Sequence, residues 1–272
     1  MKVKEKMFIR QENSRIDYGR INNVVIFHPT GIGYHIAHGL AMIGCKNITL
    51  VSKAKTKKSD LIESELNAVS YLSENLATAV KDHIDKYRRI SDLGAVLNHI
   101  RNLRNSELIS EILDNSILES LMNSLPKLNK KTGKLEVDYL VNTKAISDFD
   151  EFNSLDIKPQ VSIFTMTNIK QMVYYKLLNT KPDYLVWIDE NNDFHIVNLI
   201  DKEYSYSELY SIVEADKPVT SAISSGLRTT SQSSYADIFI LKLLLDGGVN
   251  TMVIYDDDIR DTAFSPENMV EF

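Results

Sequence analysis

The sequence predicts an α/β protein built on a mainly parallel, Rossmann-like sheet with helices on both faces. An apolar run, VVIF at residues 24–27, leads into a turn that carries glycines. Apolar residues then recur at helical spacing in YHIAHGLAMIG, residues 34–44, and a second apolar strand, NITLV, follows at residues 47–51. The order of strand, glycine turn, helix and strand is typical of the opening unit of a nucleotide-binding sheet.

Composition excludes several classes of protein. With 272 residues, 43% of them hydrophobic, the chain can bury the core of one large domain spanning residues 1–272. The formal charge of −6 argues against a nucleic-acid partner. No run approaches the ~18 to 20 apolar residues that cross a bilayer, and the N-terminus lacks the apolar core of a signal peptide. We therefore expect no membrane partner and a cytoplasmic location. The single cysteine, Cys45, excludes an intrachain disulfide and a four-cysteine zinc site.

The elements are predicted in this order along the first half of the chain. Residues 1–23 form a leading helix and linker, and residues 24–64 form the nucleotide-binding-like unit. A helical insert follows at 65–126, because apolar residues at helical spacing share one face and Pro126 ends the pattern. That face is expected to carry Leu66, Val69, Leu72, Leu76 and Val80.

Residues 135–272 supply the remaining sheet. We predict a strand at 135–143, a short helix at 148–155 and a strand at 160–166. Three further segments, at 172–178, 183–190 and 194–200, are expected to form an antiparallel meander, because short turn sequences separate them. A helix at 233–248, closed by Gly247 and Gly248, precedes the last strand at 250–258.

The glycine turn is predicted to be a poor phosphate site. In a working site the backbone approaches the phosphates and the helix N-terminus offers free N–H groups. Here the first two turn positions are His28 and Pro29, and proline has no N–H. We expect a nucleotide-like turn that is vestigial, comprising Thr30, Gly31 and Gly33, with Ser52 at the end of the second strand.

Several segments, taken in order, resemble the E1-like superfamily, also called ThiF/MoeB/HesA, which adenylates C-terminal carboxylates of ubiquitin-like proteins, sulfur carriers and some peptides. Arg10-Gln11 matches an RQ pair before the first strand, and residues 28–33 match the GxGGxG turn. Residues 48–64 match ITLVDxDxVxxSNLxRQ, and 138–146 match DVVxDATDN. Residues 158–175 match the KPLV to GQV segment, and 236–256 match the final helix and strand. The resemblance implies an E1/ThiF fold with a helical insert.

The sequence departs from the family pattern at the positions that the resemblance assigns to binding ATP and magnesium. Ser52 stands where the resemblance places the ribose-binding acid, and Ala54 replaces the next aspartate. Glu63 replaces a phosphate-contacting arginine, and Ala145 replaces the aspartate that supports magnesium. Because adenylyl transfer depends on positioning and charge stabilisation, these losses favour an inactive site with no catalytic residue.

Two functions stay open. The first is a non-catalytic E1-like protein, a pseudoenzyme without a cofactor, that binds a peptide or protein partner, possibly in a peptide-modification pathway. The second is a divergent adenylating enzyme that uses ATP and magnesium. The family implies a homodimer or a heterodimer with an active E1-like protein. In that setting Arg10 is a candidate for reaching the partner's nucleotide site, against the alternative of an ordinary surface cation.

Other residues are weighed against ordinary roles. Arg228, after Ser224-Ser225-Gly226 in a predicted loop, is a candidate for binding a partner's carboxylate. His35 and His38, three apart on one helix, are expected to be structural and not metal ligands, and Asp256 to Asp258 are expected to form a solvated loop. The TGIG sequence also resembles short-chain dehydrogenases, but Phe27 stands at their first glycine and no YxxxK follows.

Overall fold

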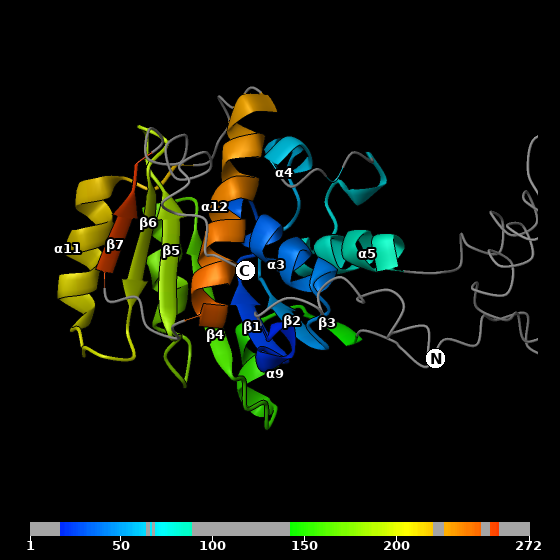
Figure 1. Ribbon diagram of the computed structural model, residues 1–272, viewed down its shortest axis with the longest axis horizontal. Coiled ribbons are helices and arrows are strands. Elements are labelled where there is room, and N and C mark those ends of the chain that lie inside the picture. The colour runs from blue at the N-terminus through cyan, green and yellow to red at the C-terminus, as the bar shows by residue number, and fades with distance from the viewer. Residues whose placement is uncertain are drawn as a thin grey trace, which may run out of the picture. The chain divides into compact units, whose positions relative to one another are not determined.

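The computed structural model describes residues 17–63, 66, 69–88, 142–219, 226–245 and 251–255 (Figure 1). The chain divides into two compact units, one comprising Met1–Arg10 and Asp85–Leu140 and the other Gln11–Ile84 and Val141–Phe272. Nearly all described residues belong to the second unit, which holds the sheet. The predicted leading helix before residue 17, and most of the predicted insert at 65–126, lie outside the described residues.

The sheet has seven strands in the order β3-β2-β1-β4-β5-β6-β7. The strands β1 (Asn23–Phe27), β2 (Asn47–Val51), β3 (Asn142–Ile146), β4 (Val161–Met166) and β5 (Tyr184–Ile188) are parallel. The last two, β6 (Phe194–Asn198) and β7 (Thr251–Ile254), pair antiparallel with their neighbours. This mostly parallel sheet with helices on both faces confirms the predicted fold class.

Alternate residues of each strand feed two separate cores, one on each face of the sheet. From β1, Val24 and Ile26 enter the first core, whereas Val25 and Phe27 enter the second. The first core is covered by α3 (Ile32–Met42), α12 (Gly226–Leu245) and residues Leu76 to Ile84 of α5 (Leu76–Arg88). The second is covered by α9 (Phe149–Ser154), α10 (Met172–Tyr175) and α11 (Tyr206–Asp216).

The opening unit follows the prediction closely. The strands β1 and β2 pair in register from Asn23↔Asn47 to Phe27↔Val51, and α3 connects them. Strand β1 begins at Asn23, one residue before the predicted start at Val24. A short 3-10 helix, η1 (Tyr18–Arg20), precedes it, and the Asp17 side chain accepts from the Gly19 N–H at its start.

The five apolar residues from Leu66 to Val80, expected on one face, do not belong to one helix. The structure has a short helix α4 (Lys58–Glu63), a 3-10 turn η2 (Val69–Tyr71) and then α5. Between the last two, Ser73 takes a φ of 67° and Asn75 forms a bridge with Lys55. The Asn75 side chain then accepts from the Thr78 N–H, which starts α5. Turn and capping chemistry therefore interrupt an otherwise helical apolar pattern.

The predicted meander is partly wrong. Residues 172–178 form no strand, because the Asn168 and Gln171 side chains make a reciprocal cap that starts the helical turns of η3 (Ile169–Gln171) and α10. The antiparallel part instead comprises β5, β6 and β7. The predicted strand at 135–143 is also displaced: β3 occupies 142–146, and residues 135–141 lie outside the described part of the chain.

Helix α12 begins at Gly226, seven residues before the predicted start at 233. Gly226 and Arg228 therefore belong to a helix and not to the predicted loop, while Ser224 and Ser225 lie outside the described residues. The predicted closing glycines, Gly247 and Gly248, and the aspartates 256–258 lie outside them too. No helix among the described residues has both the length and the apolar character needed to cross a bilayer.

Gly33 sets how closely α3 approaches β4. A Cβ on Gly33 would lie 2.5 Å from the Thr165 Oγ1 and 2.9 Å from the His28 carbonyl oxygen. We predict that Gly33→Ala lowers the free energy of unfolding by about 1 to 3 kcal/mol, because neither neighbour is free to move aside. Urea unfolding measures this change.

The matched control for Gly33→Ala is Gly39→Ala in the same helix. There the added Cβ would meet the Ile240 Cδ1 at 2.7 Å, which is the far end of a flexible side chain and can yield. We expect a smaller loss for Gly39→Ala. Equal losses in the two variants would contradict the assignment of Gly33 as the tighter contact.

Candidate functional site

The candidate site lies where the strand order reverses, between β1 and β4. From β1 the chain builds outward to β2 and β3 on one side, and β4 to β7 occupy the other side. In open α/β sheets, ligands bind beyond the carboxyl ends of strands at this kind of switch point. The predicted residues Thr30, Gly31 and Gly33 follow β1 there, and Ser52 follows the neighbouring β2.

The backbone donors of the turn are largely used within the protein. The His28 N–H donates to the Val51 carbonyl (2.9 Å), and the Thr30 N–H donates to the His28 carbonyl (2.8 Å). The Gly33 N–H donates to the Thr30 carbonyl (3.0 Å), and Pro29 has no N–H. The N–H groups of Gly31 and Ile32, at the start of α3, make no such contact among the described residues, so two backbone donors remain that a phosphate could use.

The His28 side chain fills the space behind the turn. It is 1% exposed, and its ring lies 5.0 Å from the Tyr174 ring, 5.4 Å from Phe164 and 5.8 Å from Phe149, between ring centroids. Neither ring nitrogen has a hydrogen-bond partner among the described residues. Burial in these apolar surroundings lowers the pKa of His28 from 6.5 to about 3, so the ring is uncharged at neutral pH. It therefore offers a phosphate no positive charge.

The GxGGxG pattern has four glycine positions, of which this turn keeps two. His28 takes the first position with a φ of 57°, a left-handed conformation that glycine adopts more easily. Thr30 takes the second and is 4% exposed. The last two positions are glycines: Gly31 has a φ of 52°, and Gly33 allows the close packing described above.

Ser52, at the predicted ribose position, is fully buried. Its Oγ accepts from the Ala54 N–H (3.0 Å), and its carbonyl accepts from the Asn75 side-chain amide (2.7 Å). Ala54 in turn accepts from the Leu76 N–H through its carbonyl. Hydrogen bonds therefore connect the end of β2 to the segment that starts α5. The Ser52 hydroxyl oxygen accepts a hydrogen bond from the protein backbone.

The alignment that placed Ala145 at the magnesium aspartate needs correction. Ala145 lies within β3, opposite Leu50 of β2, so it cannot follow the strand. The first acidic residue beyond β3 is Asp148, whose carboxylate accepts from the Glu151 N–H (2.8 Å) and caps α9. Sequence reasoning missed this carboxylate, although an Asp three residues before a Glu is a recognisable capping signal.

One cation lies near this edge. The Lys53 Nζ is 3.9 Å from the Asp150 carboxylate and 5.8 Å from the centre of the Phe149 ring, which itself neighbours His28. The predicted basic run at 53–58 is thus divided. Lys53 reaches across to α9, whereas Lys58 begins α4.

Asp60 in α4 is the most enclosed acidic group near the turn, at 7% exposed. Its carboxylate accepts from the Lys57 N–H (2.7 Å) and so caps the helix. Burial raises the pKa of Asp60, and the Lys57 N–H contact and charge oppose that rise. The carboxylate caps its own helix and also faces the Thr30 side chain of the turn, whose contact likewise opposes the rise in the pKa of Asp60. Glu63 ends the same helix, at the position of the family's arginine.

The remaining predicted residues do not join this site in the described structure. Arg10 lies outside the described residues, and of Arg228 only the position in α12 is described. His35 and His38 lie on α3, where the Tyr34 ring stacks on His38 and meets His35 edge-on. In the described part of the chain, no three His, Cys, Asp or Glu side chains are arranged to hold a metal ion.

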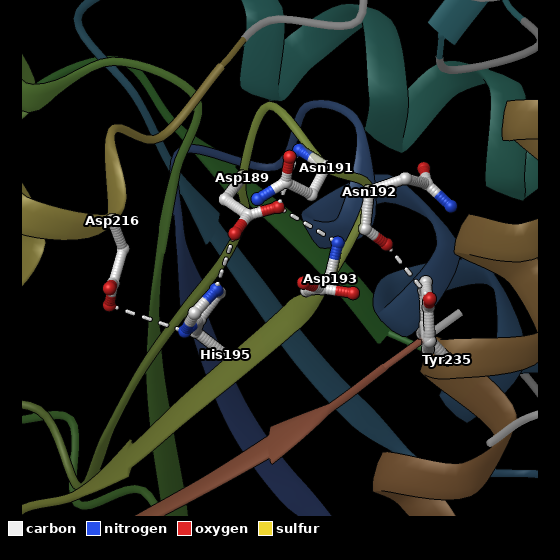
Figure 2. A network of polar contacts seen from close by, with 7 residues as sticks. All are labelled: Asp189, Asn191, Asn192, Asp193, His195, Asp216 and Tyr235. Carbon is white, nitrogen blue, oxygen red and sulfur yellow. Dashed lines mark hydrogen bonds and ion pairs between the residues drawn. The ribbon is translucent and has the colours of Figure 1, made fainter. Parts of the chain in front are cut away.

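A second polar cluster lies at the hairpin between β5 and β6 (Figure 2). His195 faces one carboxylate with each ring nitrogen: its Nε2 is 3.1 Å from the Asp189 Oδ2 and its Nδ1 is 3.2 Å from the Asp216 Oδ2. Its ring lies parallel to Trp187, with an interplanar angle of 3°. The other Asp189 oxygen accepts from the N–H groups of Asn191 and Asp193.

This cluster joins the two faces of the sheet. Asp216 ends α11 on one face, and the Tyr235 hydroxyl of α12, on the other face, donates to the Asn192 carbonyl (2.8 Å) (Figure 2). The hairpin is therefore held by helices on both sides. No local sequence pattern predicts this arrangement, because its members come from three separate segments.

Neither a protein-family model nor a curated protein sequence matches this chain. Among solved structures, that of PaaA is similar with a TM-score of 0.51 and 14% identity, over 93% of this chain and 70% of PaaA. E. coli MccB solved with ATP has a TM-score of 0.44 at 14% identity. The microcin C7 biosynthetic enzyme MccB in complex with N-formylated MccA has a TM-score of 0.43, also at 14% identity. Both MccB matches cover 88% of this chain and 62% of MccB, so the chain spans less than two thirds of that protein. The likeness to PaaA shows the fold alone.

Proposed function

We propose that this chain is a non-catalytic E1-like protein that binds a peptide or protein partner and has no nucleotide cofactor. The single observation that carries the proposal is the replacement of the first glycine of the turn after β1 by a buried, uncharged His28. Pro29 supplies no donor, and the N–H groups of His28, Thr30 and Gly33 donate to protein carbonyls, which leaves only those of Gly31 and Ile32. A nucleoside triphosphate would find few hydrogen-bond donors and no positive charge in this turn.

The intact sheet and cores support the proposal that the chain binds a partner. The sheet, both cores and the packing glycine are intact, so the scaffold persists where the phosphate chemistry has been replaced. PaaA shares this scaffold, and the MccB structures include one with N-formylated MccA. We extend a peptide-modification setting to this chain as part of the proposal. From the family resemblance we further propose that the chain forms a homodimer or a heterodimer with an active E1-like protein. In that dimer Arg10 would act in the partner's nucleotide site. Arg228 is a candidate for binding a carboxylate of the partner.

A divergent adenylating enzyme is the second candidate, and two observations favour it. Asp148 places a carboxylate directly beyond β3, where the resemblance expects a magnesium ligand. Lys53 supplies a cation at the same edge of the sheet. In an adenylating enzyme, these two residues would have to take the roles of the family's ATP-binding arginine and acidic residues. Variants of Asp148 and Lys53 therefore distinguish the two proposed functions.

Titration calorimetry with ATP and magnesium tests the proposed function. We expect no saturable binding to the full chain and no exchange of pyrophosphate into ATP when peptides with free C-terminal carboxylates are added. E. coli MccB, solved with ATP, is the positive control for the binding assay. If ATP bound, and if Asp148→Asn and Lys53→Ala each abolished that binding, the adenylating enzyme would replace the proposed function.

A further inference from the structure

An exposed apolar and basic surface surrounds α10. Val173 is 57% exposed and Leu177 is 42% exposed, although both belong to a segment whose other apolar residues pack into the second core. Val173 lies in α10 (Met172–Tyr175), and Leu177 lies in the turn that follows it, where the Leu177 N–H donates to the Tyr174 carbonyl (2.9 Å). Lys170 and Lys176 are exposed on either side of Val173 in the sequence. We call these four residues the α10 surface.

The α10 surface is held rigid by its neighbours. Met172, Tyr175 and Leu178 are buried in the second core, which fixes the backbone that carries the exposed residues. The Asn153 side chain, from α9, donates to the Leu177 carbonyl (2.7 Å) and accepts from the Asn179 N–H (3.1 Å). Exposed apolar side chains on a fixed backbone lose little conformational entropy when a partner covers them.

The segment of the chain that carries the α10 surface contains more basic than acidic residues. Residues 157–182 contain four lysines and no aspartate or glutamate, in a chain whose net charge is −6. The acidic residues that border the segment are already engaged. Asp183 accepts from the Ser162 N–H and hydroxyl, and Asp156 lies 3.9 Å from the Lys158 ammonium.

Two of the lysines are positioned by aromatic rings. The Lys176 Nζ lies 3.9 Å from the centre of the Tyr206 ring, and the Lys181 Nζ lies 4.4 Å from the centre of the Tyr175 ring. Cation–π contacts of this kind orient an ammonium group without neutralising its charge. The lysines therefore remain able to attract carboxylates.

We propose that the α10 surface docks an acidic peptide segment of the partner, with apolar side chains covering Val173 and Leu177 and carboxylates facing Lys170 and Lys176. This inference rests on the proposed function, and it names the chemical class of the partner and the surface that receives it. Opposite charges at the rim accelerate and select the encounter, while the apolar pair supplies most of the buried contact.

Fluorescence anisotropy with a short labelled peptide of glutamate and leucine tests the proposal on the full chain. The comparison probe is the same peptide with every glutamate replaced by lysine. We expect saturable binding of the acidic peptide alone. The double variant Lys170→Glu/Lys176→Glu should weaken it by about tenfold or more, as should Val173→Ser/Leu177→Ser.

Matched controls come from the opposite face of the sheet. Met42 is 50% exposed at the end of α3, and Lys46 is exposed just beyond it, so Met42→Ser and Lys46→Glu make the same chemical changes away from α10. We expect these variants to bind like the parent. Because every altered residue is exposed, unchanged thermal midpoints should show that all variants fold.

Four outcomes would overturn the proposal: equal binding of the lysine peptide, unchanged binding by the α10 variants, binding only after residues 256–272 are removed, or no binding at all. The third outcome would make the chain's own acidic C-terminal segment the occupant. Self-association that Val173→Ser/Leu177→Ser abolishes, without peptide binding, would instead make a second copy the occupant. ATP binding measured on the same sample separates failure of the proposed function from failure of this surface.

Discussion

Replacing His28 with phenylalanine should remove most of the loss of stability that the protein shows between neutral and mildly acidic pH. The His28 pKa is 6.5 in the unfolded chain and about 3 in the folded protein. Between these two values the unfolded state binds a proton that the folded state does not. The free energy of unfolding therefore falls as pH drops below 6.5, and the loss is complete below about 3.

The size of this effect follows from the shift. Each pH unit between the two pKa values costs about 1.4 kcal/mol, so about 3 kcal/mol is lost from this one group by pH 4. The neighbours Phe149, Phe164 and Tyr174 form an aromatic surrounding that a phenylalanine ring suits. At a φ of 57° a phenylalanine also strains the backbone, so we expect His28→Phe to be somewhat less stable than the parent near pH 7 and more stable than the parent at pH 4.

Urea unfolding of the parent and His28→Phe at a series of pH values measures the difference. Carboxylates with raised pKa values, such as Asp60 and Asp237, titrate in both proteins, so subtracting the two curves isolates His28. His28→Asn is the control for the backbone, because asparagine tolerates the left-handed conformation but leaves the aromatic space unfilled. The free energy of unfolding of His28→Asn should lose the same pH dependence as that of His28→Phe, and it should be lower than that of His28→Phe at every pH. A parent-like pH slope in His28→Phe would show that the ring is not the titrating group.

Removing the His195 side chain should destabilise the protein by about 3 to 5 kcal/mol, because the change removes the contacts of its two ring nitrogens with carboxylates and leaves a cavity beside Trp187. The side chains of His195 and Asp189 are 9% and 8% exposed, so water cannot readily replace the lost contact. His195→Ala also removes the ring that stacks on Trp187. The contact with Asp216 at the end of α11 is lost in the same step.

A graded series of variants separates these contributions. Asp216 is 31% exposed, so Asp216→Asn should cost less than Asp189→Asn, and both should cost less than His195→Ala. A double-mutant cycle between His195 and Asp189 measures their coupling free energy. The control histidine is His83, which is half-buried and contacts the Tyr34 hydroxyl (3.0 Å). A loss in His195→Ala no greater than that in His83→Ala would contradict the buried role assigned to His195.

Local sequence signals were sufficient where neighbouring residues decide the structure. The strands β1 and β2 and the helix between them were predicted almost to the residue, because apolar runs and helical spacing are properties of short windows. The segment at 172–178 was predicted wrongly for a related reason. Its β-branched and aromatic residues favour a strand, but the Asn168–Gln171 cap begins a helix there, and burial of Met172 and Tyr175 stabilises it.

The order of strand, glycine turn, helix and strand predicted the fold class correctly, because this pattern lies in consecutive residues. The same segment also shows that His28 and Thr30 stand at two glycine positions of the pattern. Which side chains fill the space behind the turn depends on the folded chain. The groups that enclose His28 come from α9, β4 and α10, more than a hundred residues away along the chain, and they remove its charge by excluding water. The same holds for His195, whose carboxylate partners meet only when the hairpin and the end of α11 pack together. Contacts of this kind depend on distances in space, which no local pattern of residues contains.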